Sequence, residues 1–245
     1  MATAESVKAK IQGLIDTANT ATGNEDSTLY DAVNTLVAGY GGGGGENAQK
    51  YLAMLNGTDM PEDGGTLVIP DGVTRVPKYL YQNVFGNKVV HLVIPQGVRE
   101  IGMYGFSGMG YSSGSNGTTL TLSEGLEDIG ERALQNCRYG KFVHIPTTLK
   151  TIGKEGFANG HNTIDGYDKD IELPNIVTIG QAAFSAFNFA GSNVYVGKNI
   201  TSIDTNAFNF KNAPTFTLTI DRAEDAIAGA PWGATNATIV WTGDS

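Results

Sequence analysis

The sequence is poor in the residue types on which covalent cross-links and metal sites depend. It has one cysteine, Cys137, and three histidines in 245 residues. A single cysteine cannot close a disulfide within the chain, and we expect Cys137 to be a small apolar core residue and not a reactive thiol. No two of the histidines (His91, His144 and His161) have the spacing of metal ligands, which makes a structural zinc site improbable. We therefore expect neither a metal nor a cofactor.

Basic residues and long apolar segments are also scarce. Lysine and arginine number 16 against 25 aspartates and glutamates, which gives a formal net charge of −9. A surface of this sign repels polyphosphate, so nucleic acid is not an expected partner. No apolar run approaches the roughly 20 residues that cross a bilayer, so membrane insertion is not expected either. The N-terminus lacks the basic stretch and apolar core of a secretory signal, and the C-terminus shows no export-linked anchor.

The motifs of common enzyme classes are missing as well. The sequence contains no nucleophile elbow, no zinc-protease helix motif and no phosphate-binding loop. Its 25 acidic residues leave room for a pair of glycosidase carboxylates, although nothing singles out a pair. We expect a protein that is not an enzyme, with glycoside hydrolysis as the alternative.

Acidic residues gather in the segment DGYDKDIE, which contains Asp165, Asp168, Asp170 and Glu172. A calcium site needs several oxygen ligands in a closed loop, and this segment lacks the twelve-residue pattern of the common calcium loop. A solvated loop is the favoured interpretation, and calcium binding is the alternative.

What the sequence does contain is one phrase repeated along most of its length. An apolar-x-apolar-Pro stretch is followed by an apolar residue, then Ile-Gly, then Ala-Phe or Gly-Phe. The clearest copies are LVIPQGVREIG with MYGF, VHIPTTLKTIG with KEGF, and IELPNIVTIG with QAAF. The aliphatic anchors of six copies are 25, 28, 23, 27 and 24 residues apart by subtraction: Val76, Ile101, Ile129, Ile152, Ile179 and Ile203. A period of roughly 20–29 residues with one short strand per unit predicts a leucine-rich-repeat solenoid.

Alternation along each strand separates a core face from an outward face. The residues expected to point inward are Leu92, Ile94, Leu120, Leu122, Val143, Ile145, Ile171, Leu173, Val194 and Val196. The six anchors and the residues that end each copy, Leu80, Phe106, Leu134, Phe157, Phe184 and Phe208, complete the expected core. A glycine follows the anchor in four copies (Gly102, Gly130, Gly153 and Gly180), which predicts a tight turn into a short helix. The expected fold class is an α/β repeat, a solenoid with one short strand plus a short helix or turn per repeat.

A helical hairpin is expected before the repeats. Apolar side chains recur at helical spacing in residues 5–21 and again in residues 28–37, which predicts two helices within residues 1–40. A hairpin of this size has too little area to bury alone. We expect it to attach to another protein or to make the chain a homo-oligomer.

The rest of the chain divides into three parts. Residues 41–45 are an unbroken run of glycine, which predicts a flexible linker. Residues 46–65 carry one apolar helical face and are expected to cap the first repeat. Residues 66–245 are expected to form the repeat domain, with Pro231 and Trp232 closing its far end.

Aromatic and histidine side chains on the outward strand positions, together with two long insertions, predict a contact surface. One outward row is Val68, Val93, Thr121, His144, Glu172, Tyr195 and Thr219, and its neighbour is Thr66, His91, Thr119, Phe142, Asp170, Asn193 and Thr217. The insertions, 107–118 and 159–170, are rich in Tyr, Ser, Gly and Asn, a composition suited to binding loops. The candidate ligand-binding residues are Tyr111, Phe142, His144, His161, Tyr167 and Tyr195. The alternative is a sheet covered by loops or by a sister subunit, with insertions that are passive surface loops.

The repeated phrase resembles the BspA-like leucine-rich repeats of bacterial surface proteins and of many phage and prophage proteins. The segment VKAKIQGLIDTANTATGNEDSTLYDAVNTLVAGYG looks like the N-terminal part of tail- and baseplate-associated proteins from phages of Gram-positive gut bacteria. The ending APWGATNATIVW is similar to the C-terminus of the same group. The resemblance implies a virion component that contacts the host surface, and it implies no catalytic residues.

Three functions are therefore carried forward. The first is a phage tail or baseplate protein of the virion that binds a host-surface glycan or protein, with the hairpin contacting other virion proteins. The second is a bacterial cell-surface adhesin with the same repeats. The third is a purely structural virion protein.

Overall fold

The structure is a computed structural model that describes residues 65–69, 74–76, 78, 89–109, 119–137, 141–142, 145–160, 170–189, 191–211, 213–224 and 226–243. The predicted hairpin, the glycine linker and nearly all of the predicted cap lie outside these residues, as do Leu80 and Val143. The hairpin, linker and cap therefore remain predictions.

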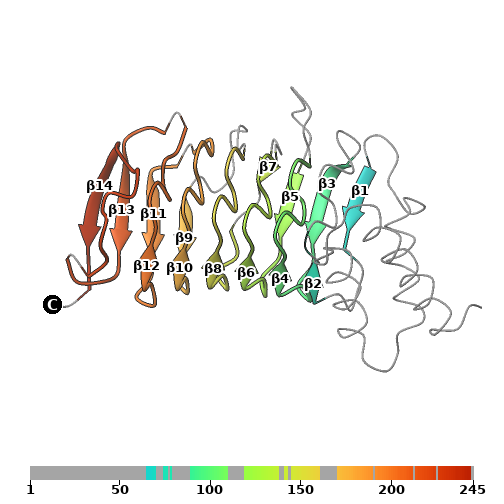
Figure 1. Ribbon diagram of the computed structural model, residues 1–245, viewed down its shortest axis with the longest axis horizontal. Coiled ribbons are helices and arrows are strands. Elements are labelled where there is room, and N and C mark those ends of the chain that lie inside the picture. Colours follow the sequence, from blue (N-terminus) through green and yellow to red (C-terminus); the bar gives the residue numbers. More distant parts are fainter. Residues whose placement is uncertain are drawn as a thin grey trace, which may run out of the picture.

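The described residues form a stack of coils in which parallel strands line two sides (Figure 1). The strands of one side are β1 (Gly65–Val68), β3 (Val89–Ile94), β5 (Thr119–Leu122), β7 (Lys141–Phe142), β9 (Ile171–Leu173), β11 (Asn193–Val196), β13 (Phe216–Ile220) and β14 (Ala237–Trp241). They form two sheets, in the orders β1-β3-β5-β7 and β9-β11-β13-β14. The repeat solenoid is therefore confirmed, with parallel strands on two sides.

Two-residue strands line the second side and form one six-stranded sheet. They are β2 (Arg75–Val76), β4 (Glu100–Ile101), β6 (Asp128–Ile129), β8 (Thr151–Ile152), β10 (Thr178–Ile179) and β12 (Ser202–Ile203). Each anchor pairs in register with the anchor of the next coil, for example Ile129 with Ile152. The charged or hydroxyl residue before each anchor forms a second row in the same register.

The core fills the space between the two sides, as the alternation predicts. All six anchors are at most 5% exposed, and Phe106, Leu134, Phe157, Phe184 and Phe208 are at most 2% exposed. The described inward residues of the longer strands are also buried: Leu92, Ile94, Leu120, Leu122, Ile145, Ile171, Leu173, Val194 and Val196. Cys137 is 5% exposed and belongs to this core, as expected.

The segment after each anchor is a run of turns, and the part of the chain that the structure describes contains no helix. The predicted short helix is therefore wrong there, although the tight turn is confirmed. Tyr104, Arg132, Glu155 and Ala182 occupy the same place in successive coils and have φ between 53° and 55°. A left-handed residue at this position interrupts a right-handed helix.

Hydrogen bonds between coils explain why the turn is preferred. The amides of Tyr104 and Phe106 donate to Glu131 and Ala133 of the next coil at 2.9 Å each. The amide between them, on Gly105, donates within its own turn to Gly102 at 2.9 Å. A helix would use all of these amides internally, whereas the turns share them between coils and still leave none unpaired.

The glycine after the anchor is required because successive coils approach closely there. A Cβ on Gly153 would lie 2.7 Å from the backbone nitrogen of Glu131 and 2.8 Å from the carbonyl carbon of Gly130. A Cβ on Gly180 would likewise lie 2.7 Å from the backbone nitrogen of Lys154 and 2.8 Å from the carbonyl carbon of Gly153. The repeated Ile-Gly pair thus sets the spacing of the stack.

Trp232 is buried in the last coil, at the end of the repeats where the sequence places a closing residue. Its side chain is 2% exposed, and its indole nitrogen donates to the carbonyl of Ala228 at 2.8 Å. The ring meets Trp241 of β14 edge-on, with centroids 6.0 Å apart. Pro231, by contrast, is exposed and lies outside the core.

Candidate functional site

The outward face of β9, β11, β13 and β14 is the part of the predicted contact surface that the structure describes best. We call it the C-terminal sheet face, made of Glu172, Asn193, Tyr195, Thr217, Thr219, Thr238 and Val240. These positions alternate with buried ones along β9, β11 and β13, and with half-buried ones along β14. Glu172, Tyr195, Thr219 and Val240 pair in one register row, and Asn193, Thr217 and Thr238 pair in the next. Hydroxyl and carboxylate groups therefore surround one aromatic ring on a regular surface.

Tyr195 is half-buried in this face. Its hydroxyl donates to Oδ2 of Asp221 at 3.3 Å, which fixes the direction of the ring. Burial raises the pKa of Tyr195, and the negative charges of Asp221 and Glu172 raise it further. The side chain therefore presents a neutral, oriented ring, the kind of group that combines an apolar contact with a polar tip.

Asp170, at the edge of the C-terminal sheet face, connects two coils. Its Oδ1 accepts hydrogen bonds from the amides of Ser192 and Asn193, and its Oδ2 accepts one from the Asn193 side chain, all at 2.8 Å. Burial alone would raise the pKa of Asp170, but these hydrogen bonds outweigh burial and lower it. Both carboxylate oxygens are thus engaged within the protein.

The calcium alternative for the acidic segment receives no support from the described residues. Asp165 and Asp168 lie outside them. Among the residues that are described, no group of three or more His, Cys, Asp or Glu side chains could hold a metal ion.

The other predicted contact residues fall into two groups. Tyr111, His144, His161 and Tyr167 lie outside the described residues, so their roles remain predictions. Phe142 is placed by its backbone, and its register differs from the one expected: Thr119 pairs with Lys141, and Leu120 pairs with Phe142. Because Ile145 is nevertheless buried, the alternation is interrupted between β7 and Ile145, a break that period-two reasoning from the sequence could not detect.

His91 is half-buried on the outward face of the N-terminal sheet. Its Nδ1 lies 2.8 Å from the Thr119 hydroxyl of the next strand. The contact connects two outward residues that the sequence placed in one row. We interpret it as a link between coils.

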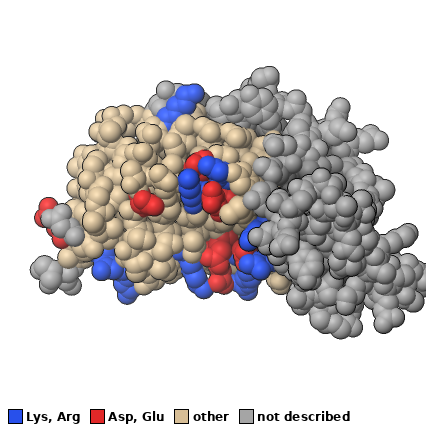
Figure 2. All heavy atoms as spheres, in the orientation of Figure 1, with Lys and Arg blue, Asp and Glu red and all other residues tan. Residues whose placement is uncertain are grey.

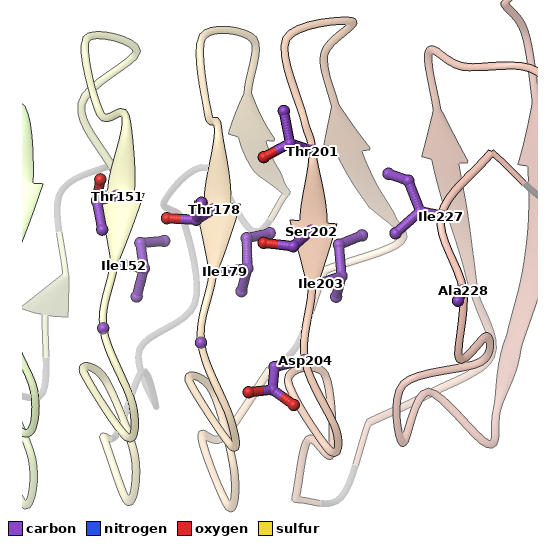
Figure 3. A pocket seen from close by; sticks show the side chains of 12 residues that line it. Thr151, Ile152, Thr178, Ile179, Thr201, Ser202, Ile203, Asp204, Ile227 and Ala228 are labelled. Carbon is purple, nitrogen blue, oxygen red and sulfur yellow. The ribbon is translucent and has the colours of Figure 1, made fainter.

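A second surface, which the sequence reasoning missed, is a groove of about 450 Å³ beside β8, β10 and β12 (Figure 3). One wall carries the hydroxyl side chains of Thr151, Thr178 and Ser202, which form one register row. Ile227 and Ala228, from the last coil, line the opposite wall. The sequence did hold a signal, because the residue before the anchor is charged in the first three coils and carries a hydroxyl group in these three.

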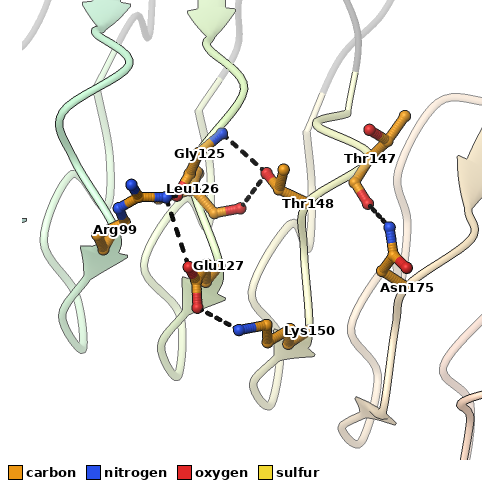
Figure 4. A network of polar contacts seen from close by, with 8 residues as sticks. All are labelled: Arg99, Gly125, Leu126, Glu127, Thr147, Thr148, Lys150 and Asn175. Carbon is orange, nitrogen blue, oxygen red and sulfur yellow. Dashed lines mark hydrogen bonds and ion pairs between the residues drawn. The ribbon is translucent and has the colours of Figure 1, made fainter.

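In the N-terminal coils, charged side chains one or two residues before the anchors form ion pairs between coils. Arg75 contacts Glu100 at 2.7 Å, and Arg99 contacts Glu127 at 3.5 Å. Glu127 also contacts Lys150, whose hydrogen bond and charge lower the pKa of that carboxyl (Figure 4). These are exposed pairs, which typically contribute little to stability, but they join neighbouring coils and neutralise one another.

Arg132 is the centre of a more enclosed cluster. It donates to both carboxylate oxygens of Glu155, at 3.0 and 3.1 Å, and to the hydroxyl of Tyr104, whose ring it also covers. The hydrogen bond from Arg132 lowers the pKa of Glu155. Tyr104, Arg132 and Glu155 come from three successive coils, so the cluster joins three repeats. On the face shown in Figure 2, basic and acidic side chains lie together near the middle of the described part, and the other charged groups there stand singly.

Cys137 is not a candidate nucleophile. Its thiol donates to the carbonyl of Phe106 at 3.1 Å, and burial raises its pKa to about 12. The reactive thiolate is therefore almost absent at neutral pH.

Within the described ranges the structure also has no helix with the length and apolar character that a bilayer crossing requires.

The comparison with protein families agrees with the fold. The chain matches the family described as BspA type leucine rich repeat region (6 copies) over residues 65–168 and 111–224, more than half of its length. The chain therefore belongs to this family of leucine-rich-repeat proteins. No curated protein matches it. A leucine-rich repeat protein from Bacteroides ovatus of known crystal structure is 16% identical, with a TM-score of 0.33, and the match covers 72% of this chain and 55% of that one.

Proposed function

We propose that the repeat domain is a non-enzymatic binding module that recognises a carbohydrate on a bacterial cell surface through the C-terminal sheet face. One observation carries the proposal: the Tyr195 ring is held in place by Asp221 and lies in register between Glu172 and Thr219. An aromatic ring can cover the apolar face of a sugar, and the carboxylate and hydroxyl groups beside it can bond to sugar hydroxyls. A protein receptor is the second ligand class that this surface fits.

The regular backbone supports a binding role over catalysis. In-register strands repeat the same outward geometry from β9 to β14, as a linear polymer with a repeating unit requires. The described residues show no thiol or metal cluster suited to catalysis. Tyr111, His161 and Tyr167 of the two insertions, with Phe142 and His144, remain proposed additional contacts, and no cofactor is part of the proposal.

The biological setting is proposed from the flanking segments. The resemblance of residues 7–41 and of the C-terminal ending to phage tail and baseplate proteins supports a place in the virion, with the hairpin bound to other tail proteins or to further copies of the chain. A bacterial cell-surface adhesin with the same repeats is the alternative. Nucleic acid and membrane insertion have no part in either proposal, because the chain carries a net charge of −9 and no apolar run of membrane length.

A glycan microarray tests the proposal. The full chain is applied to bacterial surface polysaccharides, alongside Tyr195→Ala and the control Asn209→Ala, which changes an exposed residue outside the C-terminal sheet face. We expect the parent and Asn209→Ala to bind the same glycans, and Tyr195→Ala to bind them at least tenfold more weakly, because a contacting aromatic side chain contributes more than about 1.4 kcal/mol. Equal binding by all three proteins would exclude the C-terminal sheet face, and shortened glycan products would show an enzyme.

A further inference from the structure

A ladder of backbone hydrogen bonds runs along the six-stranded sheet. In each coil the amide after the anchor donates to the anchor carbonyl of the previous coil. The bonds are Gly102 to Val76, Gly130 to Ile101, Gly153 to Ile129, Gly180 to Ile152 and Asp204 to Ile179, with lengths of 2.8, 2.8, 2.7, 2.8 and 2.9 Å. Each anchor carbonyl from Val76 to Ile179 therefore faces the next coil and is bonded there.

The ladder stops at Ile203. The last coil does provide an apolar side chain, because Ile227 follows 24 residues later and is 5% exposed. Ala228 occupies the place of the donating residue, but among the described residues no backbone amide donates to the carbonyl of Ile203. β12 is thus the edge of its sheet, paired only with β10.

The groove runs along β8, β10 and β12 and reaches the place beside β12 where a further strand would pair. Figure 3 shows Ile203 and Ser202 on one side of the space and Ile227 and Ala228 on the other. Its volume of about 450 Å³ is within the range of ligand pockets. Asp204 is the one charged residue among the described residues that line it, so the groove favours a ligand with positive charge.

We propose that the groove binds an extended peptide segment of a partner protein, which adds to β12 as a parallel strand. The segment donates an amide to the carbonyl of Ile203, as the five preceding coils do, and places a β-branched side chain beside Ile203 and Ile227. A basic residue next to the donating amide pairs with Asp204. Unpaired strand edges bind peptides in this manner in many proteins, with backbone hydrogen bonds providing affinity and side-chain pockets providing specificity.

The chain's own repeat supplies a probe. An acetylated and amidated peptide with the sequence of residues 149–154, Leu-Lys-Thr-Ile-Gly-Lys, contains the anchor, the donating glycine amide and two lysines. The matched control has N-methylglycine in place of the glycine, which removes the donor and changes no side chain. Both peptides are titrated into the ¹⁵N-labelled full chain, and the amide signals are followed by NMR.

We expect saturable shifts centred on Ser202, Ile203, Asp204 and Ala228, and roughly tenfold weaker binding of the N-methylated peptide, as for loss of a buried hydrogen bond. Ala228→Trp, which fills the groove, should abolish the shifts, whereas Thr238→Trp on the C-terminal sheet face should leave them unchanged. Equal affinity of the two peptides, shifts elsewhere or no binding would overturn the proposal. So would shifts produced there by sugars and not by the peptide, or concentration-dependent self-association that Ala228→Trp abolishes in the absence of peptide binding.

Discussion

At the scale of single residues, a column of phenylalanine rings stabilises the C-terminal half of the core. Phe157 and Phe184 stack with centroids 5.2 Å apart and planes 3° apart, and Phe184 and Phe208 stack at 6.0 Å and 9°. Phe187 contacts two of these rings edge-on. Offset-stacked and edge-on pairs of this kind contribute beyond the area they bury.

Truncation of one ring should therefore be costly. Phe157→Ala removes a side chain that is 2% exposed and leaves a cavity between two coils, which should lower the free energy of unfolding by about 3–5 kcal/mol. Chemical denaturation measures the change, with the exposed Gln181→Ala as control. Unchanged stability in Phe157→Ala would show that the core is not packed as described.

The periodic part of the core could be predicted residue by residue, and the local contacts could not. Every described anchor and strand residue that alternation assigned to the interior is buried, because period and polarity are properties of the sequence itself. The hydrogen bond between Tyr195 and Asp221 joins residues 26 positions apart, and the repeated phrase specifies neither side chain. The contribution of Phe187 to the ring column was likewise not predicted, because it lies outside the repeated phrase.

At the scale of the elements, the turns after the anchors differ most from expectation. The sequence Ile-Gly followed by Ala-Phe fits both a short helix and a series of turns. The choice depends on the neighbouring coil, which accepts the alternate amides, and a single repeat read alone does not contain that information. The same holds for β7, whose pairing with β5 differs by one residue from the expected register and whose alternation is interrupted before Ile145.

The close approach of coils at the glycines gives a direct test of the turn geometry. In Gly153→Ala the added methyl group would lie 2.7–2.8 Å from backbone atoms of the previous coil, which cannot move independently. We expect a loss of about 1–3 kcal/mol, as for other overpacked sites, together with a lower thermal midpoint. Lys154→Ala, one residue later and without that contact, is the control, and equal midpoints for the two variants would contradict the described stacking.

At the scale of the whole molecule, a solenoid is joined to a segment for which we predict a role in assembly. The solenoid is shown over the described residues, and the hairpin of residues 1–40 is a prediction from its two apolar stripes. The hydroxyl-lined groove ends beside β12, beyond which the last coil adds no strand to this sheet, and repeat spacing alone does not reveal that edge.

The predicted role of the hairpin in assembly can be tested by measuring particle mass with and without it. A fragment that begins at Glu46 should keep the thermal midpoint of the repeat domain and should be monomeric by light scattering, whereas the full chain should associate through its hairpin. The same number of chains per particle for both proteins would show that the hairpin does not drive assembly.

Receptor binding by the repeat domain can be measured as adsorption of the fluorescent fragment that begins at Glu46 to cells of Gram-positive gut bacteria. We expect saturable binding to cells of a host strain, weakened at least tenfold by Tyr195→Ala and competed by polysaccharide from the same cells. If the folded fragment binds no host cell, the repeats are not a receptor-binding domain, and a purely structural role in the virion becomes the better account.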